Sequence, residues 1–293
     1  MKFTYFDVGS IMEETEREEK GEFSECLETY ETTGFSHRWI QPPVVCYFVT
    51  TVDEFGNVNC TPVSMGTAFQ AAPPDMKWCY AFAVANNRHA KKNLDATGEC
   101  VISYYPCSLL RESEIAGLPV PEGISEIEVA GLTPLPSEKV KPCGIAECIS
   151  NLEAKVIHKV QISGSTLYVF EIVGVNVQAE ILEKDKQMML EPGLGMADLL
   201  YEVSIKGKPP RLNYMRMDQS RIYSTPDDIG SDQFWVGTFE EWMDSEERRG
   251  KLSAPEKEHI LKLNELWGEN RDPRVNGQVK EELTASLRRL MKH

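Results

Sequence analysis

The chain has 293 residues, 41% of them hydrophobic and 26% charged, which is ordinary for a globular protein of one large or two modest domains. Its formal net charge of −15 disfavours nucleic acids and anionic membranes as partners, although a small anionic ligand could still meet a locally positive site. No apolar run approaches the ~20 residues of a membrane helix, and acidic residues 13–19 stand where a signal peptide would be apolar, so a cytoplasmic location is predicted.

The eight cysteines form no C-x-x-C pair, and the spacing of Cys143 and Cys148 fits no zinc signature. Four others lie in strand-like runs, where cysteine acts as a small hydrophobe: Cys46, Cys60, Cys79 and Cys100. We therefore predict reduced, mostly structural thiols and no metal site.

Residues 1–35 are predicted to form an N-terminal arm. Ser10 is placed to cap a helix that runs through Ile11, Met12 and the acidic residues that follow. Thr32-Thr33-Gly34 then indicates a linker to the main domain.

The main domain is predicted to be mainly β. Six runs have strand-like composition: 44–52, 57–65, 77–84, 100–105, 148–161 and 166–177. Asp53–Gly56 and Ser163–Ser165 supply the turn signals of two hairpins. Six antiparallel strands favour a β-barrel, because closure removes the exposed edges of the sheet.

Small and hydroxylated residues fill the stretch from Asn59 to Pro74, between two of these strands. Thr61, Ser64, Gly66 and Thr67 leave the backbone accessible, which suits a flat polar ligand laid against main-chain amides. This stretch is our first candidate for a binding site.

A short helix is predicted over residues 86–98, with Asn86 or Asn87 as its N-cap and Gly98 at its end. Arg88 lies at its start, and Lys91 and Lys92 follow one turn later. Amides at a helix start together with an arginine make an anion site, whereas the alternative is a solvated basic face.

Further along, residues 108–116 indicate a short helix, 118–142 a long irregular excursion, 201–210 an irregular segment and 211–223 an extended one. Helices are predicted over 233–248, 255–269 and 279–292, the second with a cap at Ser253. We therefore divide the chain into an arm (1–35), a barrel domain (36–225) and a helical C-terminal extension (226–293) that covers the barrel or a partner subunit.

Several stretches, in this order, resemble the flavin reductase-like family, the FMN-binding split barrel. They are Pro42–Val45, Thr50–Asn59, Thr61–Met65, Pro73–Pro74, Asn93–Glu99 and Ala130–Pro134. The resemblance covers residues 40–177, roughly half of the chain. It implies a six-stranded Greek-key split barrel that forms a homodimer, with FMN near the dimer interface.

The resemblance also implies a site. Residues 62–67 would lie along the flavin ring and its ribityl chain, and residues 87–90 would take the phosphate. The candidate cofactor-binding residues are Thr61, Pro62, Val63, Ser64, Met65, Gly66, Thr67, Asn87, Arg88, His89 and Asn93. The chain departs from the family pattern at Ala90, where threonine is common, and at Met65 and Gly66, where larger aromatic residues are common.

The expected activity is that of an oxidoreductase in which NADH or NADPH transfers a hydride to flavin N5 and an unidentified acceptor takes the electrons. Such a step requires no acid, base or nucleophile from the protein, so no catalytic residue is assigned. His89 is predicted to be a helix residue, and His37 and His158 to be structural. Two alternatives share the same motifs: an FMN-containing electron carrier without a nicotinamide site, and a flavin-free split barrel that holds a protein partner. The pyridoxine phosphate oxidase branch resembles the chain less well.

Overall fold

The computed structural model describes residues 44–71, 74, 76–178 and 238–291, together with the backbone of five short strands at 2–5, 13–16, 200–203, 213–216 and 221–224. Cys26, the linker at 32–34 and the segment 204–212 lie outside the described residues. So do Pro42, Pro43 and Pro73, which belong to the stretches that carried the resemblance.

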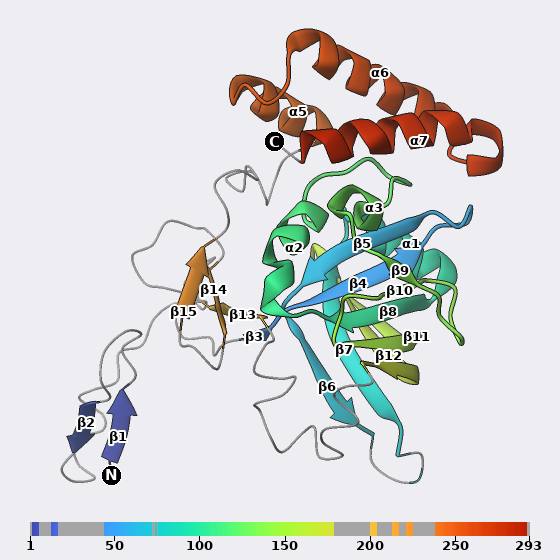
Figure 1. Cartoon of the computed structure of the whole chain (residues 1–293). Coiled ribbons are helices and arrows are strands. Elements are labelled where there is room, and N and C mark those ends of the chain that lie inside the picture. The colour runs from blue at the N-terminus through green and yellow to red at the C-terminus, as the bar shows by residue number, and fades with distance from the viewer. Residues whose placement is uncertain are drawn as a thin grey trace.

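The centre of the molecule is one antiparallel sheet with the order β5-β4-β8-β11-β12-β7-β6 (Figure 1). Its strands are β4 (Tyr47–Val52), β5 (Val58–Val63), β6 (Gly66–Gln70), β7 (Trp78–Ala85), β8 (Glu99–Tyr104), β11 (Ser150–Ile162) and β12 (Ser165–Val177). The sequence predicted six of these seven strands. It missed β6, because the small residues of that strand indicated an irregular segment. The predicted Greek-key arrangement stays a prediction.

This sheet curves back on itself. β5 and β6 stand at opposite ends of the strand order, yet only Ser64 and Met65 separate them in the chain. Gly66 allows the close approach, because a Cβ atom there would lie 2.1 Å from the hydroxyl of Tyr47 on β4. Because β5 and β6 are the end strands, each pairs along one edge only. The backbone amides predicted to be accessible to a ligand are therefore limited to the outer edges of these two strands.

Short elements cover the connections of the barrel. They are α1 (His89–Thr97), a 3-10 turn (Cys107–Leu109), α2 (Leu110–Ala116), α3 (Glu126–Ala130), β9 (Pro134–Leu135) and β10 (Gly144–Ile145). The excursion predicted as irregular over 118–142 thus contains α3 and β9, and β9 pairs with β10 just beyond it. Gly98 ends α1 in the left-handed conformation with φ of 68°, as predicted, but the N-cap is Arg88 and not an asparagine.

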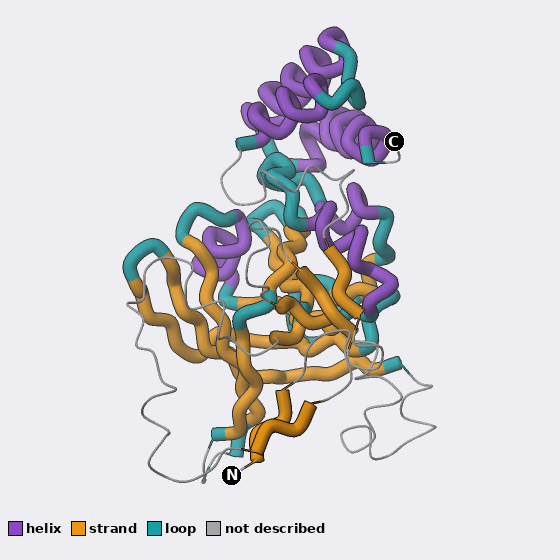
Figure 2. The backbone as a smooth tube through the Cα atoms, turned by 90° about the vertical axis from the view of Figure 1, so that its left-hand side faces the viewer, coloured by secondary structure: helices purple, strands orange, loops and turns teal. Residues whose placement is uncertain are grey.

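The C-terminal extension forms three helices above α3 (Figures 1 and 2), namely α5 (Phe239–Arg248), α6 (Ala254–Glu269) and α7 (Pro273–Leu290). Thr238 caps α5 through the backbone N–H of Glu241, and Ser253 and Glu256 form the predicted cap of α6. Self-capped, amphipathic segments of this kind are readily found in sequence.

Three hydrophobic cores stack from the barrel to the extension. The barrel interior is aromatic, with Tyr47, Phe82 and Phe170 in contact. A second core fills the space between the other face of β4–β5 and helices α2 and α3. The third joins the 115–129 segment to α5–α7, with Trp267 only 1% exposed. The extension is therefore continuous with the fold through the α2–α3 layer.

Two smaller sheets correct the prediction. β1 (Lys2–Tyr5) pairs with β2 (Glu13–Glu16), so the helix expected through the acidic run is wrong at residues 13–16. β13 (Leu200–Val203) lies between β14 (Asn213–Arg216) and β3 (Val44–Val45), and β15 (Arg221–Ser224) pairs with β14. The extended segment predicted over 211–223 thus contains two strands, whereas Tyr201–Val203 is a strand and not irregular.

Candidate functional site

A cavity of about 860 Å³ lies where the barrel, the start of α1, the 114–126 segment and the C-terminal extension meet. Eight of the eleven predicted site residues line it: Thr61, Pro62, Val63, Ser64, Met65, Asn87, Arg88 and His89. Two segments that are more than twenty residues apart in the chain thus share one cavity, as the sequence predicted. A volume of this size is sufficient for a nucleotide-sized ligand.

The start of α1 offers unpaired donors to this cavity. Arg88 is the N-cap, and no side chain accepts a hydrogen bond from the first turn. The backbone N–H groups of His89 and Ala90 make no backbone hydrogen bond within the described residues, whereas those of Lys91 and Lys92 bond to the carbonyl of Arg88. Free amides and the helix dipole favour an anion at this point.

Arg88 adds a fixed charge. Its side chain is half-buried and lines the cavity, and burial lowers its pKa without removing its charge. Within the described part of the chain, its guanidinium group makes no ion pair or hydrogen bond, whereas Lys91 pairs with Asp95 and Lys92 with Glu122. Of the predicted basic cluster, Arg88 is thus the member that remains available to a ligand.

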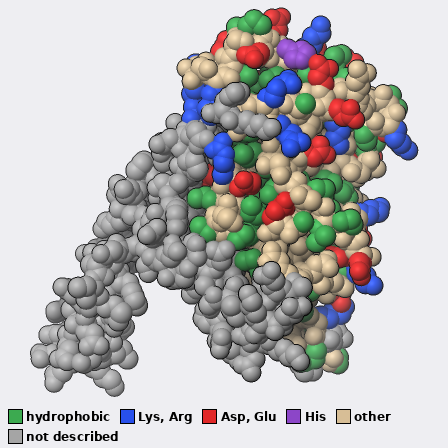
Figure 3. Space-filling view, in the orientation of Figure 1, with side chains coloured by type: hydrophobic (Ala, Val, Ile, Leu, Met, Phe, Trp, Pro, Cys, Tyr) green, Lys and Arg blue, Asp and Glu red, His purple; other side chains and the backbone are tan. Residues whose placement is uncertain are grey.

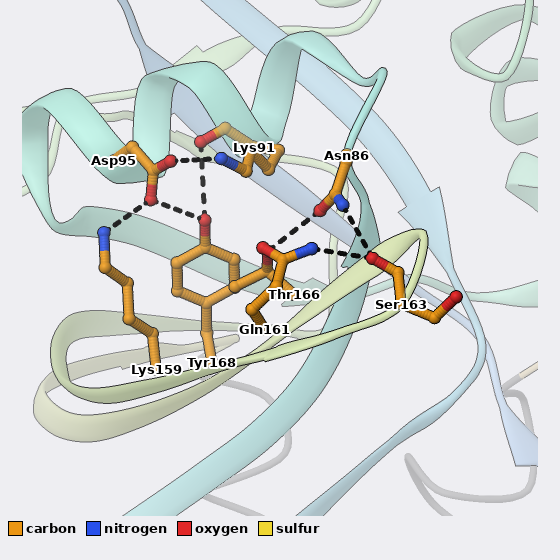
Figure 4. Close-up of polar contacts among 8 residues, drawn as sticks. All are labelled: Asn86, Lys91, Asp95, Lys159, Gln161, Ser163, Thr166 and Tyr168. Carbon is orange, nitrogen blue, oxygen red and sulfur yellow. Dashed lines mark hydrogen bonds and ion pairs between the residues drawn. The ribbon is translucent and has the colours of Figure 1, made fainter.

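Polar contacts with the β11–β12 hairpin hold α1 in place (Figure 4). The carboxylate of Asp95 accepts hydrogen bonds from Lys91 (2.5 Å), Lys159 (2.8 Å) and the Tyr168 hydroxyl (2.9 Å). These contacts, with Lys159 first, lower the pKa of Asp95 to about 2. At the start of the helix, Asn86 accepts from Thr166 and donates to the Ser163 carbonyl. Asp95, near the end of α1, and Asn86, just before its start, are therefore both tied to the same hairpin.

On the barrel side, a buried carboxyl group supports the wall. Glu126 of α3 accepts from Asn59 Nδ2 and from the backbone N–H of Cys60, both at 2.7 Å. Burial raises the pKa of Glu126 to about 8, although the two hydrogen bonds oppose the shift. Glu126 thus clamps β5 to α3 and carries little negative charge into the cavity at neutral pH.

A charged cluster closes the side of the cavity that faces the extension. Glu122 pairs with Lys92 at 2.5 Å and with Arg271, between α6 and α7, at 2.6 Å. Burial would raise the pKa of Glu122, but these two cations outweigh burial and lower it. Burial also lowers the pKa of neighbouring His89. His89 is thus neutral at pH 7, and the charges here are two cations and one carboxylate.

Three predicted site residues do not line the cavity. Gly66 packs on Tyr47 and Tyr80 in the barrel, and the hydroxyl of exposed Thr67 donates to the carbonyl of Ala68. Asn93 is buried and donates to Thr51 Oγ1 at 3.1 Å, which ties α1 to β4. Their proposed part in binding has no support from this cavity.

Sequence reasoning missed the cavity residues of the second half of the site, among them Glu122, Glu126, Asn264 and Arg271. The 118–142 segment was predicted to be irregular, and the extension only to cover some surface. The sequence offered one signal, the glycine at position 123. In the structure Gly123 has φ of +84°, and a Cβ there would lie 3.0 Å from Trp267 Cζ2. Spacing alone could not have identified Trp267 as its neighbour.

These residues fit a phosphate-bearing planar ligand such as a flavin nucleotide. The helix start and Arg88 supply the anion end, and the small residues of the 61–65 wall supply a flat surface. The described surface in Figure 3 mixes acidic and basic side chains, so on that face no single broad basic area appears. In the described ranges, no cluster of His, Cys, Asp or Glu is arranged to hold a metal, and no helix is long and apolar enough to span a membrane.

Curated relatives match parts of this chain. The chain is 31% identical over 122 residues to an uncharacterised protein of Halalkalibacterium halodurans (40% of this chain, 56% of the relative). It is 32% identical over 104 residues to one of Pyrococcus abyssi (36% of this chain, 59% of the relative). The chain thus spans little more than half the length of these curated relatives.

Two solved structures share the fold. Nitrilotriacetate monooxygenase component B from Bacillus cereus has a TM-score of 0.52 at 20% identity, covering 65% of this chain and 95% of that one. A protein from Shewanella frigidimarina, described as a flavin reductase with a split barrel domain, has a TM-score of 0.51 at 18% identity, covering 71% and 94%.

The model of the flavin reductase like domain matches residues 42–202, which is more than half of the chain. This match includes β4 to β12, the start of α1 and the 61–65 wall. The chain therefore belongs to the flavin reductase-like family.

Proposed function

We propose that the protein binds FMN in this cavity and acts as an oxidoreductase that passes electrons from NADH or NADPH to an acceptor. The observation that carries the proposal is the unpaired Arg88 beside the free amides of α1, facing the 61–65 wall in one cavity. When bound, the flavin supplies the hydride-accepting ring. We further propose that it works as a cytoplasmic homodimer, with an arm, a barrel domain and an extension as its three parts.

The residues of the chain bind and orient the ligand. Arg88 and the amides of His89 and Ala90 hold the phosphate, as a charged side chain and a helix start do together. Thr61 to Met65 support the planar ring system, and Glu126 keeps this wall in place through Asn59 and Cys60. Ala90 contributes its amide alone, since it lacks a hydroxyl group.

The first experiment is an absorption spectrum of the purified protein, followed by identification of the flavin released on heating. We expect flavin bands and FMN, and anaerobic NADH or NADPH should then bleach the bands faster than it bleaches free FMN. A colourless protein that also fails to take up added FMN or FAD would overturn the proposal and favour the flavin-free alternative.

Substitution of Arg88 tests the location of the phosphate. Arg88→Ala should weaken FMN binding by ~1.5–3 kcal/mol, the contribution of a charge-assisted hydrogen bond, and should leave riboflavin binding unchanged. Arg274→Ala is the matched control, because Arg274 is 83% exposed, pairs with Asp272 and does not line the cavity. Equal FMN affinity in the wild type and in Arg88→Ala would place the phosphate elsewhere.

A second candidate is an electron carrier that lacks a nicotinamide site. It is favoured by the extension, which lines the same cavity with Thr238, Phe239, Asn264 and Arg271. For a carrier, dithionite should bleach the bound flavin, whereas NADH and NADPH should have no effect beyond that on free FMN.

A further inference from the structure

The C-terminal extension brings to the cavity a cation that lies outside the matched family region. Arg271 stands in the short connection between α6 and α7, whereas the family model ends at residue 202. Both it and Arg88 line the cavity, and they come from segments more than 180 residues apart. A ligand with a single phosphate would need only the α1 end.

The position of Arg271 is fixed by the barrel. Its backbone carbonyl accepts from Asn57 Nδ2 at 3.0 Å, and Asn57 Oδ1 accepts from Lys280 Nζ at 2.9 Å. Nearby, Trp267 Nε1 donates to the carbonyl of Glu122 at 2.8 Å, next to the tight approach at Gly123. The guanidinium group therefore stands at a defined place in the wall.

Part of this guanidinium group has no partner. Nη1 pairs with Glu122, but Nε is buried and makes no hydrogen bond within the described residues. Because Nε is closed to solvent, a ligand in the cavity would interact with the charge of the guanidinium group and not with this donor. Because Glu122 is shared with Lys92, one carboxylate stands against two cations, and Arg88 adds a third. Among these four groups the cations outnumber the carboxylate, while Glu114 adds a second carboxylate to the described lining of the cavity.

We propose that Arg271 binds the second phosphoryl group of a diphosphate-bridged dinucleotide, so that the extension makes the cavity a dinucleotide site. This inference rests on the proposed function, which places the first phosphoryl group at Arg88. The diphosphate comes either from FAD, bound in place of FMN, or from the nicotinamide dinucleotide that reduces the flavin. In both cases Arg271 selects for the larger ligand through the charge of its guanidinium group.

The test compares ligands that differ by one phosphoryl and one nucleoside unit. Dissociation constants of FMN and FAD are measured by flavin fluorescence for the wild type, for Arg271→Gln and for the control Arg274→Gln. If FAD is the source, Arg271→Gln should weaken FAD by about tenfold or more and leave FMN within about twofold. If the nicotinamide dinucleotide supplies the diphosphate, Arg271→Gln should raise the KM of NADH by this factor. The KM of reduced nicotinamide mononucleotide and the dissociation constants of both flavins should then stay unchanged.

Two features keep the result interpretable. FMN is an internal control for folding, because a damaged protein would lose the binding of both flavins together. If Arg271→Gln is damaged in this way, Glu122→Gln is used to test the inference. That variant releases Arg271 and Lys92 from their carboxylate partner and should strengthen binding of the dinucleotide relative to the mononucleotide. The inference would be overturned if Arg271→Gln left unchanged both the ratio of the FAD and FMN dissociation constants and the ratio of the KM values for NADH and reduced nicotinamide mononucleotide. Where Arg271→Gln fails to fold, the same unchanged ratios in Glu122→Gln would overturn it. FMN binding in these proteins would still preserve the proposed function. A wild type that binds neither flavin would overturn both.

Discussion

Helix α1 of the barrel and helix α5 of the extension begin in opposite ways. Thr238 and Glu241 cap α5 reciprocally, with the Thr238 N–H donating to Glu241 Oε2 at 2.8 Å and the Glu241 N–H to Thr238 Oγ1 at 3.2 Å. α1 begins at Arg88 with no side-chain cap, and its first amides remain unpaired within the described residues. A helix that satisfies its own start needs nothing further, whereas an uncapped start beside a cavity is available to a ligand.

The two regions also differ in what stabilises them. The barrel is a curved seven-stranded sheet around aromatic side chains, and α1 adds Ala90 and Leu94 to its buried core. The extension shares its core with residues 115–129, and its largest buried side chain, Trp267, packs against that segment. The cavity lies at the junction, so the stability of the extension and the shape of the site are linked.

The largest expected effect is the loss of the anchor of the extension. Trp267→Ala should lower the free energy of unfolding by ~3–5 kcal/mol, because it removes a fully buried indole and its hydrogen bond to Glu122. Leu266→Ala is the control on the same helix, since Leu266 is 38% exposed. Urea denaturation measures both variants. Equal losses in the two would show that α6 is not held by this contact.

A pH series tests the clamp between α3 and β5. The pKa of Glu126 is about 8 in the folded protein and about 4.3 in an unfolded chain. The folded state therefore holds the extra proton between these values. The stability from this group is complete below about pH 4.3 and is lost as the pH rises to 8, by up to ~1.4 kcal/mol per pH unit.

Glu126→Gln removes this titration, so its stability relative to the wild type should rise between pH 5 and pH 8. Chemical denaturation at several pH values measures the difference. A constant difference across this range would mean that the carboxyl group is already ionised in the fold.

Two glycines separate backbone strain from contact with the extension. Gly56 and Gly123 both have positive φ, but a Cβ at Gly56 would meet nothing, whereas one at Gly123 would meet Trp267. Gly56→Ala should cost ~1–2 kcal/mol for the strain alone, and Gly123→Ala ~1–3 kcal/mol more for the crowding. Thermal denaturation measures the loss of stability in both variants. Equal losses would argue against close packing between the 118–124 segment and α6.

The smallest effect concerns the helix starts themselves. Thr238→Ala should destabilise the protein by ~1 kcal/mol, because two reciprocal bonds at α5 are lost. Asn87→Ala should leave the stability of the ligand-free protein within ~0.5 kcal/mol, since the structure shows no cap from Asn87. A comparable loss in Asn87→Ala would show that Asn87 caps α1 after all.

Local patterns of residue type in the sequence predicted much of the fold. The β-branched and aromatic runs predicted β4, β7, β8, β11 and β12, and Gly98 marked the end of α1. Prediction failed where local composition was ambiguous. Small residues concealed β6, the acidic run 13–19 imitated a helix where β2 forms, and asparagines next to α1 imitated caps. In the two strands, backbone pairing with the adjacent strand overrode the preference of the single residues: β2 pairs with β1 and β6 with β7.

By itself, the sequence determined the type of nearly every central element, because element type depends on short-range chemistry. Local residue types also singled out the 61–65 wall and Arg88, whereas the family resemblance implied that they belong to one site. Only the tertiary structure decided that Glu122, Glu126 and Arg271 complete the cavity. Their roles arise from burial and from contacts between distant parts of the chain, such as Glu126 with Asn59 and the ion pair between Glu122 and Arg271. No periodicity or spacing encodes such contacts, since they exist only once the chain has folded.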